Sequence, residues 1–542
     1  MVVQLQKFTL DELIDQAVLK YSSRIALIYE GSIMTYEQLG RNVNRLAKGL
    51  VKLGVSKGDK IGIWMPDNYA WVYSYFAITK IGAIAVPINA RYRVHEAKYI
   101  LNHAEVNVLI ISDLKPWIQN YVESMYELCP GMSESKSKPL VLKDFPHLRY
   151  VLTVGPRSHD GMLTMDQAMD IGMEVTDEDL RSGCPVEPGD IAVLQYTSGT
   201  TAFPKGCVIT QEIVVRNSLA CALRLEIEEC GDVFCDVMPP YHVIGITFAI
   251  VPSIAYGCCR IGMDHFDPLE VFQVVEKEKC TVHSGMADMI KAELDHPEFS
   301  KYDLSSLRKG ICGDSPTVFK KVHEVLPNWK IIGLYGLSEV GGNLCTPRTS
   351  DSFETRMTHG TPHDGLEIKI IDPATGKSLP RNVQGELCAR GWTIMKGYYK
   401  DPEATRKTID QDGWLHTGDR ACIGDDGRLR WSGRIKDVMK VGGENVSPKE
   451  VEDYLIQYPK VQYVQVVGVS DPKLIEAVAA FVELKKGEKC TEDEIIQFCK
   501  GKIASFKIPK YVRFVESWPM SATKVQKNKL REQLEQEFQK AK

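Results

Sequence analysis

The stretch YTSGTTAFPKG, residues 196–206, restricts the fold and chemistry of this chain more than any other. It follows the apolar run at residues 191–194, which predicts a buried strand leading into a loop. Backbone N–H groups, four hydroxyls and the ammonium of Lys205 are donors suited to a single anion. Gly199 and Gly206 are expected to adopt backbone angles that let the amides converge. The loop therefore predicts a polyphosphate ligand.

The spacing of this loop excludes a Walker A loop, in which glycine and four further residues precede Gly-Lys-Ser/Thr. A ligand-free surface loop rich in serine, threonine and glycine is the alternative that the stretch alone leaves open. Three other stretches argue against that alternative. They are YGLSE at residues 335–339, GD at 418–419 and GRIKD at 433–437.

Taken together and in this order, these stretches resemble the signature of the adenylate-forming superfamily. That superfamily includes acyl- and aryl-CoA synthetases, the adenylation domains of peptide synthetases and firefly luciferase. The resemblance extends from about Met34 to Leu530 and is greatest to a stand-alone acyl-CoA or aryl-CoA ligase. It implies that ATP and Mg²⁺ activate a carboxylic acid as its adenylate, and that coenzyme A then receives the acyl group. Transfer to a carrier protein or another acceptor is one alternative, and nucleotide binding without turnover is another.

The resemblance also implies a role in fatty acid metabolism, whereas composition by itself fits a multidomain enzyme. A chain of 542 residues is expected to form two or more domains, and 44% hydrophobic with 25% charged residues is typical of a soluble globular protein. The net charge of −5, without a block of like charge, indicates neither nucleic acid nor an anionic membrane as partner. Fifteen cysteines without metal-ligand spacing predict free thiols in the reducing cytoplasm. No run approaches the roughly 18 apolar residues of a membrane-spanning helix. A homodimer is left open.

Apolar periodicity predicts an α/β fold. Residues 39–53 have helical spacing, and residues 60–65, 83–87 and 106–111 read as short buried strands, so layered α/β subdomains are expected. Short strands and turns at residues 360–431 predict a β-rich subdomain. The resemblance implies a large N-terminal AMP- and acyl-binding domain at residues 1–435. It also implies a small, mobile α+β lid domain at residues 436–542.

Most candidate residues are assigned by the resemblance to ATP. Adenylation brings two anions together, so donors and positive charge are needed where negative charge develops. The phosphate loop would contribute Thr197, Ser198, Gly199, Thr200, Thr201 and Lys205, with Ala202 where the family commonly has glycine. The adenine side would involve Gly313, Asp314, Ser315, Tyr335, Gly336 and Ser338. Asp419 would accept the ribose hydroxyls with Arg434 beside it, because a carboxylate only accepts hydrogen bonds. Glu339 and Thr200 would hold Mg²⁺, which prefers oxygen ligands.

The acid is expected to bind near His242, in the segment PPYHVIG at residues 239–245. By the resemblance, His242 would lie beside the carboxylate and control passage between acid and thiol. The pocket would be bordered by Tyr241, Val243, Ile244, Ser284, Gly285, Gly341 and Asn343. The small residues Ser284 and Gly285 indicate a roomy apolar pocket, which discriminates by only about 1–3 kcal/mol per methylene. Medium-chain, alicyclic, aryl and carnitine-type acids therefore all stay open.

Two lysines are expected to serve separate steps. Lys524, in PMSATKVQK at residues 519–527, would bridge the acid and the α-phosphate. Its motif lacks a glycine and is one residue short, so Lys527 and Lys529 are alternatives. Lys440 belongs to the motif expected to serve CoA transfer, in which Gly442 and Gly443 would line the pantetheine tunnel. Lys436 and Asp437 would mark the hinge.

Overall fold

The computed structural model describes residues 8–114, 118–134, 139–197, 204–313, 315–441, 444–471, 473–520 and 525–540. These residues form two compact units. The first contains Met1–Glu367 and Arg390–Gly413, and the second contains Ile368–Ala389 and Trp414–Lys542. The second unit thus includes strands that precede the expected boundary at residue 435, and bending at Lys436 and Asp437 stays a prediction. The α/β fold class is confirmed.

The first unit contains a seven-stranded sheet in the order β14-β13-β12-β10-β11-β1-β2. All its neighbouring strands are parallel except β1 and β2. The strands are β1 (Ile25–Tyr29), β2 (Ser32–Thr35), β10 (Val233–Asp236), β11 (Cys259–Gly262), β12 (Val282–Ser284), β13 (Lys309–Ile311) and β14 (Lys330–Ile332).

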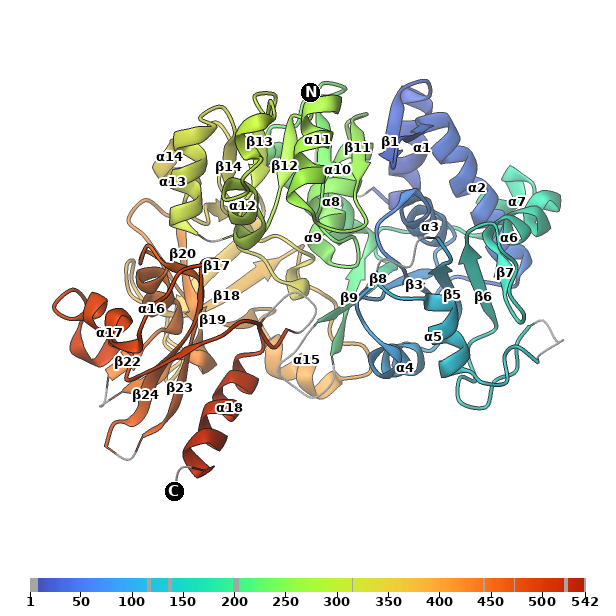
Figure 1. The fold of residues 1–542 in the computed structure, drawn as a ribbon. Coiled ribbons are helices and arrows are strands. Elements are labelled where there is room, and N and C mark those ends of the chain that lie inside the picture. The colour runs from blue at the N-terminus through green and yellow to red at the C-terminus, as the bar shows by residue number, and fades with distance from the viewer. Residues whose placement is uncertain are drawn as a thin grey trace. The chain divides into compact units, whose positions relative to one another are not determined.

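Helices cover both faces of this sheet, because successive strand residues point to opposite sides. Cys235 and Ile331 pack with α11 (Pro268–Glu278), α12 (Ala287–Leu294) and α13 (Pro316–Val325). Their chain neighbours Phe234 and Ile332 pack instead with α8 (Gln211–Leu225) and η2 (Ile246–Ile250). The ribbon shows this layering (Figure 1).

A second seven-stranded sheet of the first unit has the order β7-β6-β5-β3-β4-β8-β9. Only β8 and β9 are antiparallel to each other. The strands are β3 (Lys60–Trp64), β4 (Ile84–Pro87), β5 (Val106–Ser112), β6 (Tyr150–Val154), β7 (Leu163–Thr164), β8 (Ile191–Thr197) and β9 (Lys205–Thr210). Apolar side chains of α4 (Val94–His103) and α5 (Tyr121–Leu128) pack on one face. The expected helix at residues 39–53 is α2 (Tyr36–Lys52), and Thr35 caps its N-terminus in a capping box with Gln38.

The remaining elements of the first unit include the buried helix α3 and several short helices and strands. They are α1 (Leu10–Tyr21), α3 (Tyr69–Lys80), α6 (Met165–Ile171), η1 (Gly172–Glu174), α7 (Asp177–Gly183), α9 (Val243–Gly245), α10 (Val251–Ala255), η3 (Phe299–Lys301), η4 (Ser338–Val340), β15 (Cys345–Thr346), α14 (Phe353–Arg356), β16 (Thr361–Pro362) and α15 (Pro402–Thr408).

The second unit contains two further sheets. One has the strand order β17-β18-β19-β20. The other has the order β22-β21-β24-β23, and β25 pairs with β24. Their strands are β17 (Leu366–Ile371), β18 (Gly385–Gly391), β19 (Leu415–Ile423), β20 (Leu429–Arg434), β21 (Met439–Val441), β22 (Glu444–Val446), β23 (Val461–Asp471), β24 (Ile475–Leu484) and β25 (Tyr511–Phe514). The helices are η5 (Ile435–Asp437), α16 (Pro448–Leu455), α17 (Glu492–Cys499), η6 (Ser505–Lys507) and α18 (Lys527–Lys540).

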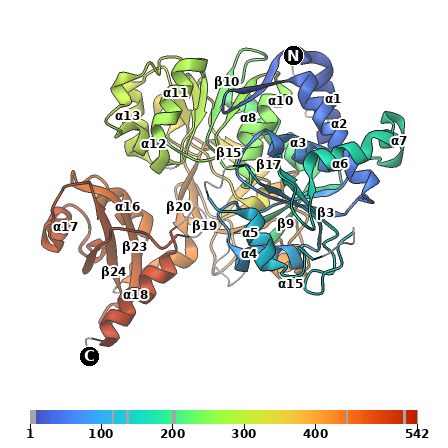
Figure 2. The same cartoon turned by 45° about the vertical axis from the view of Figure 1, so that its right-hand side comes forward.

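The core of the second unit follows the alternation along β24. Val478, Ala480 and Val482 pack with α16 and α17 on one face. Ala479 and Phe481 point to the other face, where α18 covers them. This is the α+β arrangement expected from the sequence, and Figure 2 shows the helices on both sides of β23 and β24.

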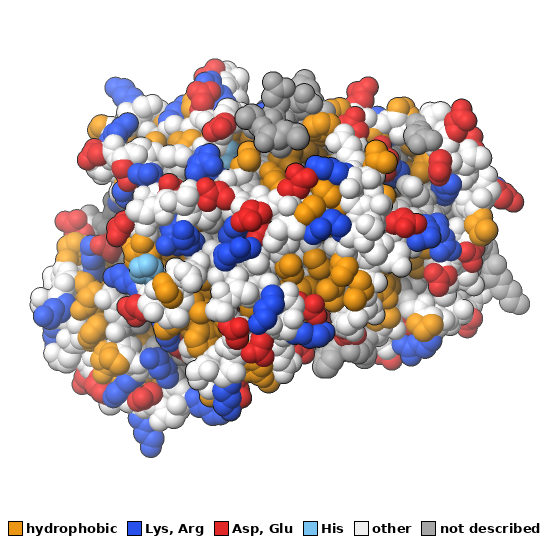
Figure 3. All heavy atoms as spheres, turned by 90° about the horizontal axis from the view of Figure 1, so that it is seen from above, with side chains coloured by type: hydrophobic (Ala, Val, Ile, Leu, Met, Phe, Trp, Pro, Cys, Tyr) orange, Lys and Arg blue, Asp and Glu red, His pale blue; other side chains and the backbone are white. Residues whose placement is uncertain are grey.

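None of the helices in the described ranges is both long enough and apolar enough to cross a bilayer. All fifteen cysteines are free, and most are buried, which confirms the expectation of unpaired thiols. Acidic and basic side chains are interspersed over the face drawn in Figure 3, in keeping with the small net charge.

Candidate active site

Four neighbouring parallel strands of the first sheet end beside the segments singled out in the sequence. Ligands of open α/β sheets bind outside the carboxyl ends of such strands. Tyr241 and His242 follow β10, and Ser284 ends β12. Gly313 follows β13, and Tyr335 follows β14. The backbone joins two of these ends directly, because Gly285 N donates to Ile311 O at 3.1 Å and Gly313 N to Gly285 O at 3.3 Å.

The phosphate stretch begins and ends in an antiparallel hairpin, in which Thr197 of β8 pairs with Lys205 of β9. The hydroxyl of Thr197 donates to Lys205 O at 3.4 Å. Gly206 lies within β9 and has no positive φ, so the expectation of an unusual backbone angle was wrong at this residue. A Cβ at Gly206 would instead lie 3.2 Å from the Tyr196 ring, so this glycine leaves room for that ring.

Glu339 lies in η4, beyond the end of β14. Its Oε1 accepts a hydrogen bond of 2.8 Å from the hydroxyl of Tyr398, and its backbone carbonyl accepts one of 2.9 Å from Met395 N. The Nζ of Lys205 lies 4.9 Å from the centre of the Tyr398 ring. Tyr398 therefore contacts both the proposed metal ligand and the proposed phosphate lysine. Burial, then the charge of Glu339, raises the pKa of the Tyr398 phenol, so the hydroxyl stays a donor.

A buried polar network holds the segment that follows Glu339. Asn217 of α8 donates through Nδ2 to Val340 O at 3.2 Å and to Asn343 O at 2.7 Å. Thr393 Oγ1 donates to Val340 O at 2.7 Å. Asn343 Nδ2 contacts His363 Nε2 at 2.8 Å. Burial, then the positive charge of Arg224, lowers the pKa of His363 to about 3, so its ring is neutral at neutral pH.

Gly341 fits this segment because its φ is +63° and a Cβ there would meet Ile213 Cγ2 at 2.3 Å. Gly336 allows an even closer backbone approach, since its Cβ would lie 1.8 Å from Gly342 O. Asn343 is fully buried, and its amide is engaged with the polar network. Its contact with the acid stays a prediction.

Two hydroxyls predicted to face ligand also have structural partners. Ser315 caps α13 by accepting a hydrogen bond from Val318 N. Ser284 Oγ accepts a hydrogen bond of 3.1 Å from Ile311 N and is buried. Contact of either hydroxyl with adenine or acid stays a prediction.

The segment after β10 is held by the second sheet of the same unit. Gln195 of β8 donates through Nε2 to Tyr241 O at 2.9 Å, and both residues are buried. The His242 ring is half-buried, with its centroid 5.0 Å from that of Tyr241. Val243 is buried and Ile244 half-buried at the start of α9. The proposed acid-binding segment is thus fixed to the strand that leads into the phosphate loop.

Within the second unit, the two residues expected to hold ribose are paired. Asp419 of β19 lies opposite Arg434 of β20, and Arg434 Nε lies 3.1 Å from Asp419 Oδ1. Only 6% of the Asp419 side chain is exposed, against 42% of Arg434. Gly418 has a φ of +67° and donates to Glu386 Oε1 at 3.1 Å, which fixes the turn before Asp419. A buried carboxylate oriented by an arginine is suited to accept sugar hydroxyls.

The tail lysines differ in their contacts. Lys527 begins α18, and its Nζ lies 2.6 Å from Glu452 Oε1. This alternative to Lys524 therefore already forms an ion pair within the second unit. Lys529 is exposed on the same helix. Lys440, at the centre of β21, has an exposed side chain, and its N–H donates to Glu476 Oε2 at 2.6 Å. Lys436 and Asp437 lie in η5, and burial lowers the pKa of Lys436.

Some predicted site residues lie outside the described part of the chain. They are Ser198, Gly199, Thr200, Thr201, Asp314, Gly442, Gly443 and Lys524. Sequence reasoning missed Tyr398, Asn217, Thr393 and His363. The adjacent tyrosines in GYY, residues 397–399, were a signal in a region otherwise read as short strands and turns. The other three carry no local signal.

Comparison with known proteins identifies the class to which this fold and site belong. The model of the AMP-binding enzyme family matches residues 14–399, and that of the AMP-binding enzyme C-terminal domain matches residues 450–524. The chain therefore belongs to the AMP-binding enzyme family, and the resemblance to the adenylate-forming superfamily is confirmed.

Individual relatives agree with this assignment over nearly the whole chain. The Bacillus subtilis (strain 168) protein YngI, named as a candidate acyl-CoA synthetase, is 40% identical and aligns over 97% of this chain and 96% of its own. The mitochondrial medium-chain acyl-CoA ligase ACSF2 of Danio rerio is 34% identical, over 98% of this chain and 89% of its own. The crystal structure of the anthranilate CoA ligase AuaEII in complex with anthranoyl-AMP has a TM-score of 0.85 at 26% identity, covering 97% of both chains.

Proposed function

We propose that this protein is an ATP-dependent acid–CoA ligase. In the first step, a carboxylate oxygen of the acid attacks the α-phosphorus of ATP, forming acyl-AMP and releasing pyrophosphate. In the second step, the CoA sulfur attacks the acyl carbon, so a thioester forms, AMP leaves and the thiol proton passes to solvent. The observation that carries the proposal is that the segments for acid, adenine and metal follow neighbouring parallel strands of one sheet.

The donors around Glu339 fit Mg²⁺. The ion prefers a few carboxylate oxygens together with water and substrate phosphates, and Glu339 offers a half-buried carboxylate with further lone pairs beyond the one bonded to Tyr398. Thr200 would add a hydroxyl. When bound, Mg²⁺ offsets negative charge on the phosphates. Tyr398 keeps the carboxylate oriented, and Lys205 offers a positive charge from the end of the phosphate loop.

Roles in the second unit follow the family motifs. Asp419 would accept the ribose hydroxyls, with Arg434 keeping its carboxylate oriented. Lys524 would bridge the acid and the α-phosphate during adenylation, and Lys440 would serve the later CoA step. The sequence-based expectation of a cytoplasmic protein stays a prediction, and one relative is named as mitochondrial.

The acid that we infer is a medium-chain fatty acid. The name of the ACSF2 relative supports this choice, because that protein aligns over almost the whole chain. Small residues at positions 284 and 285 are consistent with an apolar chain of several methylenes. Each methylene buried contributes about 0.8 kcal/mol, so acids should be ranked by chain length up to the limit of the pocket.

Carboxylate-dependent ATP–pyrophosphate exchange tests the first step, and mass-spectrometric detection of thioester tests the second. The panel would contain straight-chain acids of increasing length, benzoate, anthranilate and malonate, each with and without CoA. Exchange and thioester formation that are strongest for medium-chain acids would support the whole proposal. Exchange without thioester would indicate another acceptor, and ATP binding without exchange for any acid would contradict ligase activity.

A further inference from the structure

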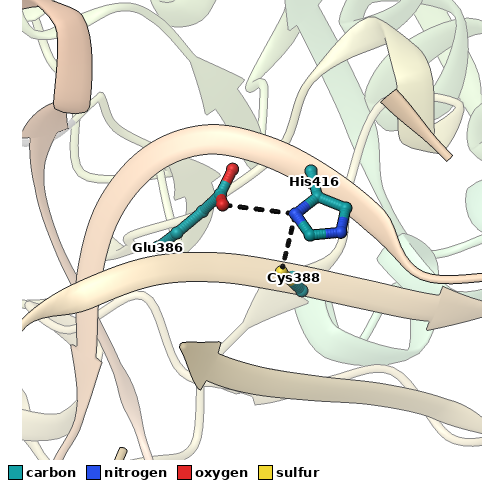
Figure 4. A group of neighbouring side chains, drawn as sticks. All are labelled: Glu386, Cys388 and His416. Carbon is teal, nitrogen blue, oxygen red and sulfur yellow. Dashed lines mark hydrogen bonds and ion pairs between the residues drawn. The ribbon is translucent and has the colours of Figure 1, made fainter. Parts of the chain in front are cut away.

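Three potential metal ligands gather on two neighbouring strands of the second unit, and none of them is among the residues assigned to Mg²⁺. Glu386 and Cys388 belong to β18, and His416 belongs to β19. Their ligand atoms all lie within 4.8 Å of one another, and the three side chains converge in Figure 4. This is a donor set of one carboxylate, one thiol and one imidazole.

Sheet geometry explains why these side chains meet. Glu386 and Cys388 are two residues apart on β18, so their side chains emerge on the same face. His416 lies directly opposite Cys388 on β19. The register between β18 and β19 shifts between Glu386 and Cys388, so Glu386 does not pair with Gly418. The Glu386 carboxylate instead accepts a hydrogen bond of 3.1 Å from the Gly418 N–H. The arrangement is therefore built into the strand pair and does not depend on flexible loops.

The two distances from His416 fit a tetrahedral ion. His416 Nδ1 lies 3.6 Å from Cys388 Sγ and 3.2 Å from Glu386 Oε2. With Zn–S near 2.3 Å and Zn–N and Zn–O near 2.1 Å, tetrahedral angles place S and N about 3.6 Å apart and N and O about 3.4 Å apart. Both distances from His416 are thus within tenths of an ångström of those around Zn²⁺, and Cys388 Sγ and the Glu386 oxygen, which lie within 4.8 Å of each other, would close to about 3.6 Å on binding.

We propose that Glu386, Cys388 and His416 form a binding site for a thiophilic divalent cation, with Zn²⁺ as the ion that matches its donors. Mg²⁺ does not suit a thiolate and an imidazole, whereas Zn²⁺ binds sulfur, nitrogen and oxygen together. On binding, the S–H bond of Cys388 breaks, an S–Zn bond forms and the proton passes to solvent. Glu386 and the thiolate then offset both charges of the ion, while His416 binds as the neutral imidazole.

Solvent can reach this cluster, and a neighbouring backbone N–H orients one of its ligands. His416 and Glu386 keep 30% and 15% of their side chains exposed, so a water molecule can take the fourth position. The N–H of Gly418 holds the other oxygen of Glu386, an outer contact of the kind that orients metal-bound carboxylates. A bound ion would join β18 to β19 and stabilise this sheet.

The experiment uses the full-length protein in a non-chelating reductant, with Co²⁺ as a coloured substitute for Zn²⁺. One equivalent of Co²⁺ should give a thiolate-to-cobalt absorption band that Zn²⁺ abolishes by displacement. Calorimetry in buffers of different ionisation enthalpy should detect about one proton released per Zn²⁺ bound. Zn²⁺ should also raise the melting temperature, because it binds the folded state. None of these readouts depends on ATP, acid or CoA, so they can fail while the ligase proposal stands.

Variants assign the signals to Cys388 and Glu386. Cys388→Ser should lose the cobalt band and the released proton, and Glu386→Gln should weaken Zn²⁺ binding at least 10-fold while preserving the size of the side chain. Cys422→Ser is the matched control. Cys422 is a buried thiol like Cys388, but it lies on β19 and outside the cluster. Unchanged binding in both folded variants, equal loss in Cys422→Ser, or no thiolate band in the wild-type protein would each overturn the site.

Discussion

The phenolic hydroxyl of Tyr398 lies 2.8 Å from Oε1 of Glu339, although the two residues are 59 positions apart in the chain. Segment 396–399 also continues the hairpin of the phosphate loop. Lys396 N donates to Val208 O at 3.0 Å, and Tyr399 N donates to Gly206 O at 2.8 Å. One short segment thus connects the proposed metal ligand to the strand that closes the phosphate loop.

Tyr398→Phe should lower kcat/KM for MgATP by about 10- to 100-fold, because a hydrogen bond to a charged group contributes about 1.5–3 kcal/mol. The aromatic ring beside Lys205 is kept, so the loss reports on the hydroxyl. Equilibrium binding of ATP should become less dependent on Mg²⁺ concentration in this variant. Pyrophosphate exchange and calorimetric ATP binding at several Mg²⁺ concentrations are the measurements.

Tyr399→Phe is the matched control for this change. Its hydroxyl also donates to a carboxylate, Glu105 Oε2 at 3.1 Å, but that carboxylate is not a predicted site residue. Tyr399→Phe should keep the wild-type Mg²⁺ dependence. If both variants lose activity equally, Tyr398 supports the fold and does not specifically orient Glu339.

Asp419→Asn should raise the Kd for ATP by about 10-fold or more. The change removes a buried carboxylate that would accept the ribose hydroxyls, and it leaves Arg434 without its 3.1 Å partner. Calorimetric titration with ATP and with 2′,3′-dideoxy-ATP measures the effect. The variant should no longer distinguish the two nucleotides, whereas the wild-type protein should prefer ATP.

The control for that substitution is Asp426→Asn, which weakens a more exposed pair with Arg430 in the same unit. Solvent-exposed ion pairs contribute little, so ATP binding should stay at the wild-type level. Retained preference for ATP in Asp419→Asn would show that another residue recognises the ribose.

The two lysines of the tail should separate the two half-reactions. Lys524→Ala should abolish pyrophosphate exchange and spare thioester formation from supplied acyl-AMP. Lys440→Ala should instead affect thioester formation more than pyrophosphate exchange. Lys527→Ala is the comparison, since it breaks a partly exposed ion pair with Glu452 and should cost only about 0.2–1 kcal/mol of stability. Normal exchange in Lys524→Ala, with loss in Lys527→Ala, would transfer the adenylation role to Lys527.

Local patterns in the sequence were sufficient to predict most elements. The apolar run at residues 60–65 became β3 because an uninterrupted short run suits a strand covered on both faces. The spacing of Leu39, Val43, Leu46 and Leu50 predicted the buried side of α2. The proximity of Asp419 and Arg434 was also expected from their motifs, and the two lie side by side in one sheet.

Contacts that depend on tertiary pairing could not be predicted in this way. Asn217 lies 123 residues from Val340 and 126 from Asn343, yet it fixes both carbonyls. Nothing in the surrounding helix sequence distinguishes Asn217 from an asparagine exposed to solvent. The register shift at Glu386 likewise depends on how β18 and β19 pair, so the meeting of Glu386, Cys388 and His416 becomes visible only in the folded sheet.

The neutral state of His363 should make stability fall as the solution becomes acidic. Burial, then the charge of Arg224, lowers its pKa from 6.5 to about 3. Between these values the unfolded chain binds a proton that the folded protein does not, so this contribution is complete above pH 6.5 and is lost toward pH 3. From pH 6.5 to pH 5 the loss should be on the order of 2 kcal/mol.

Urea unfolding at pH 5, 6 and 7 measures this effect in the wild-type protein and in His363→Gln. The variant should be less stable at pH 7, because Asn343 loses its imidazole partner, but its stability should depend less on pH. His265→Gln is a control of opposite sign, since a hydrogen bond to the Asp264 carboxylate raises the pKa of His265. His265 therefore stabilises the protein below its unfolded pKa and loses that contribution as pH rises, so its removal should steepen the acid loss. Equal pH dependence in the wild-type protein and His363→Gln would mean that His363 accepts a proton within the fold and that its polar network rearranges.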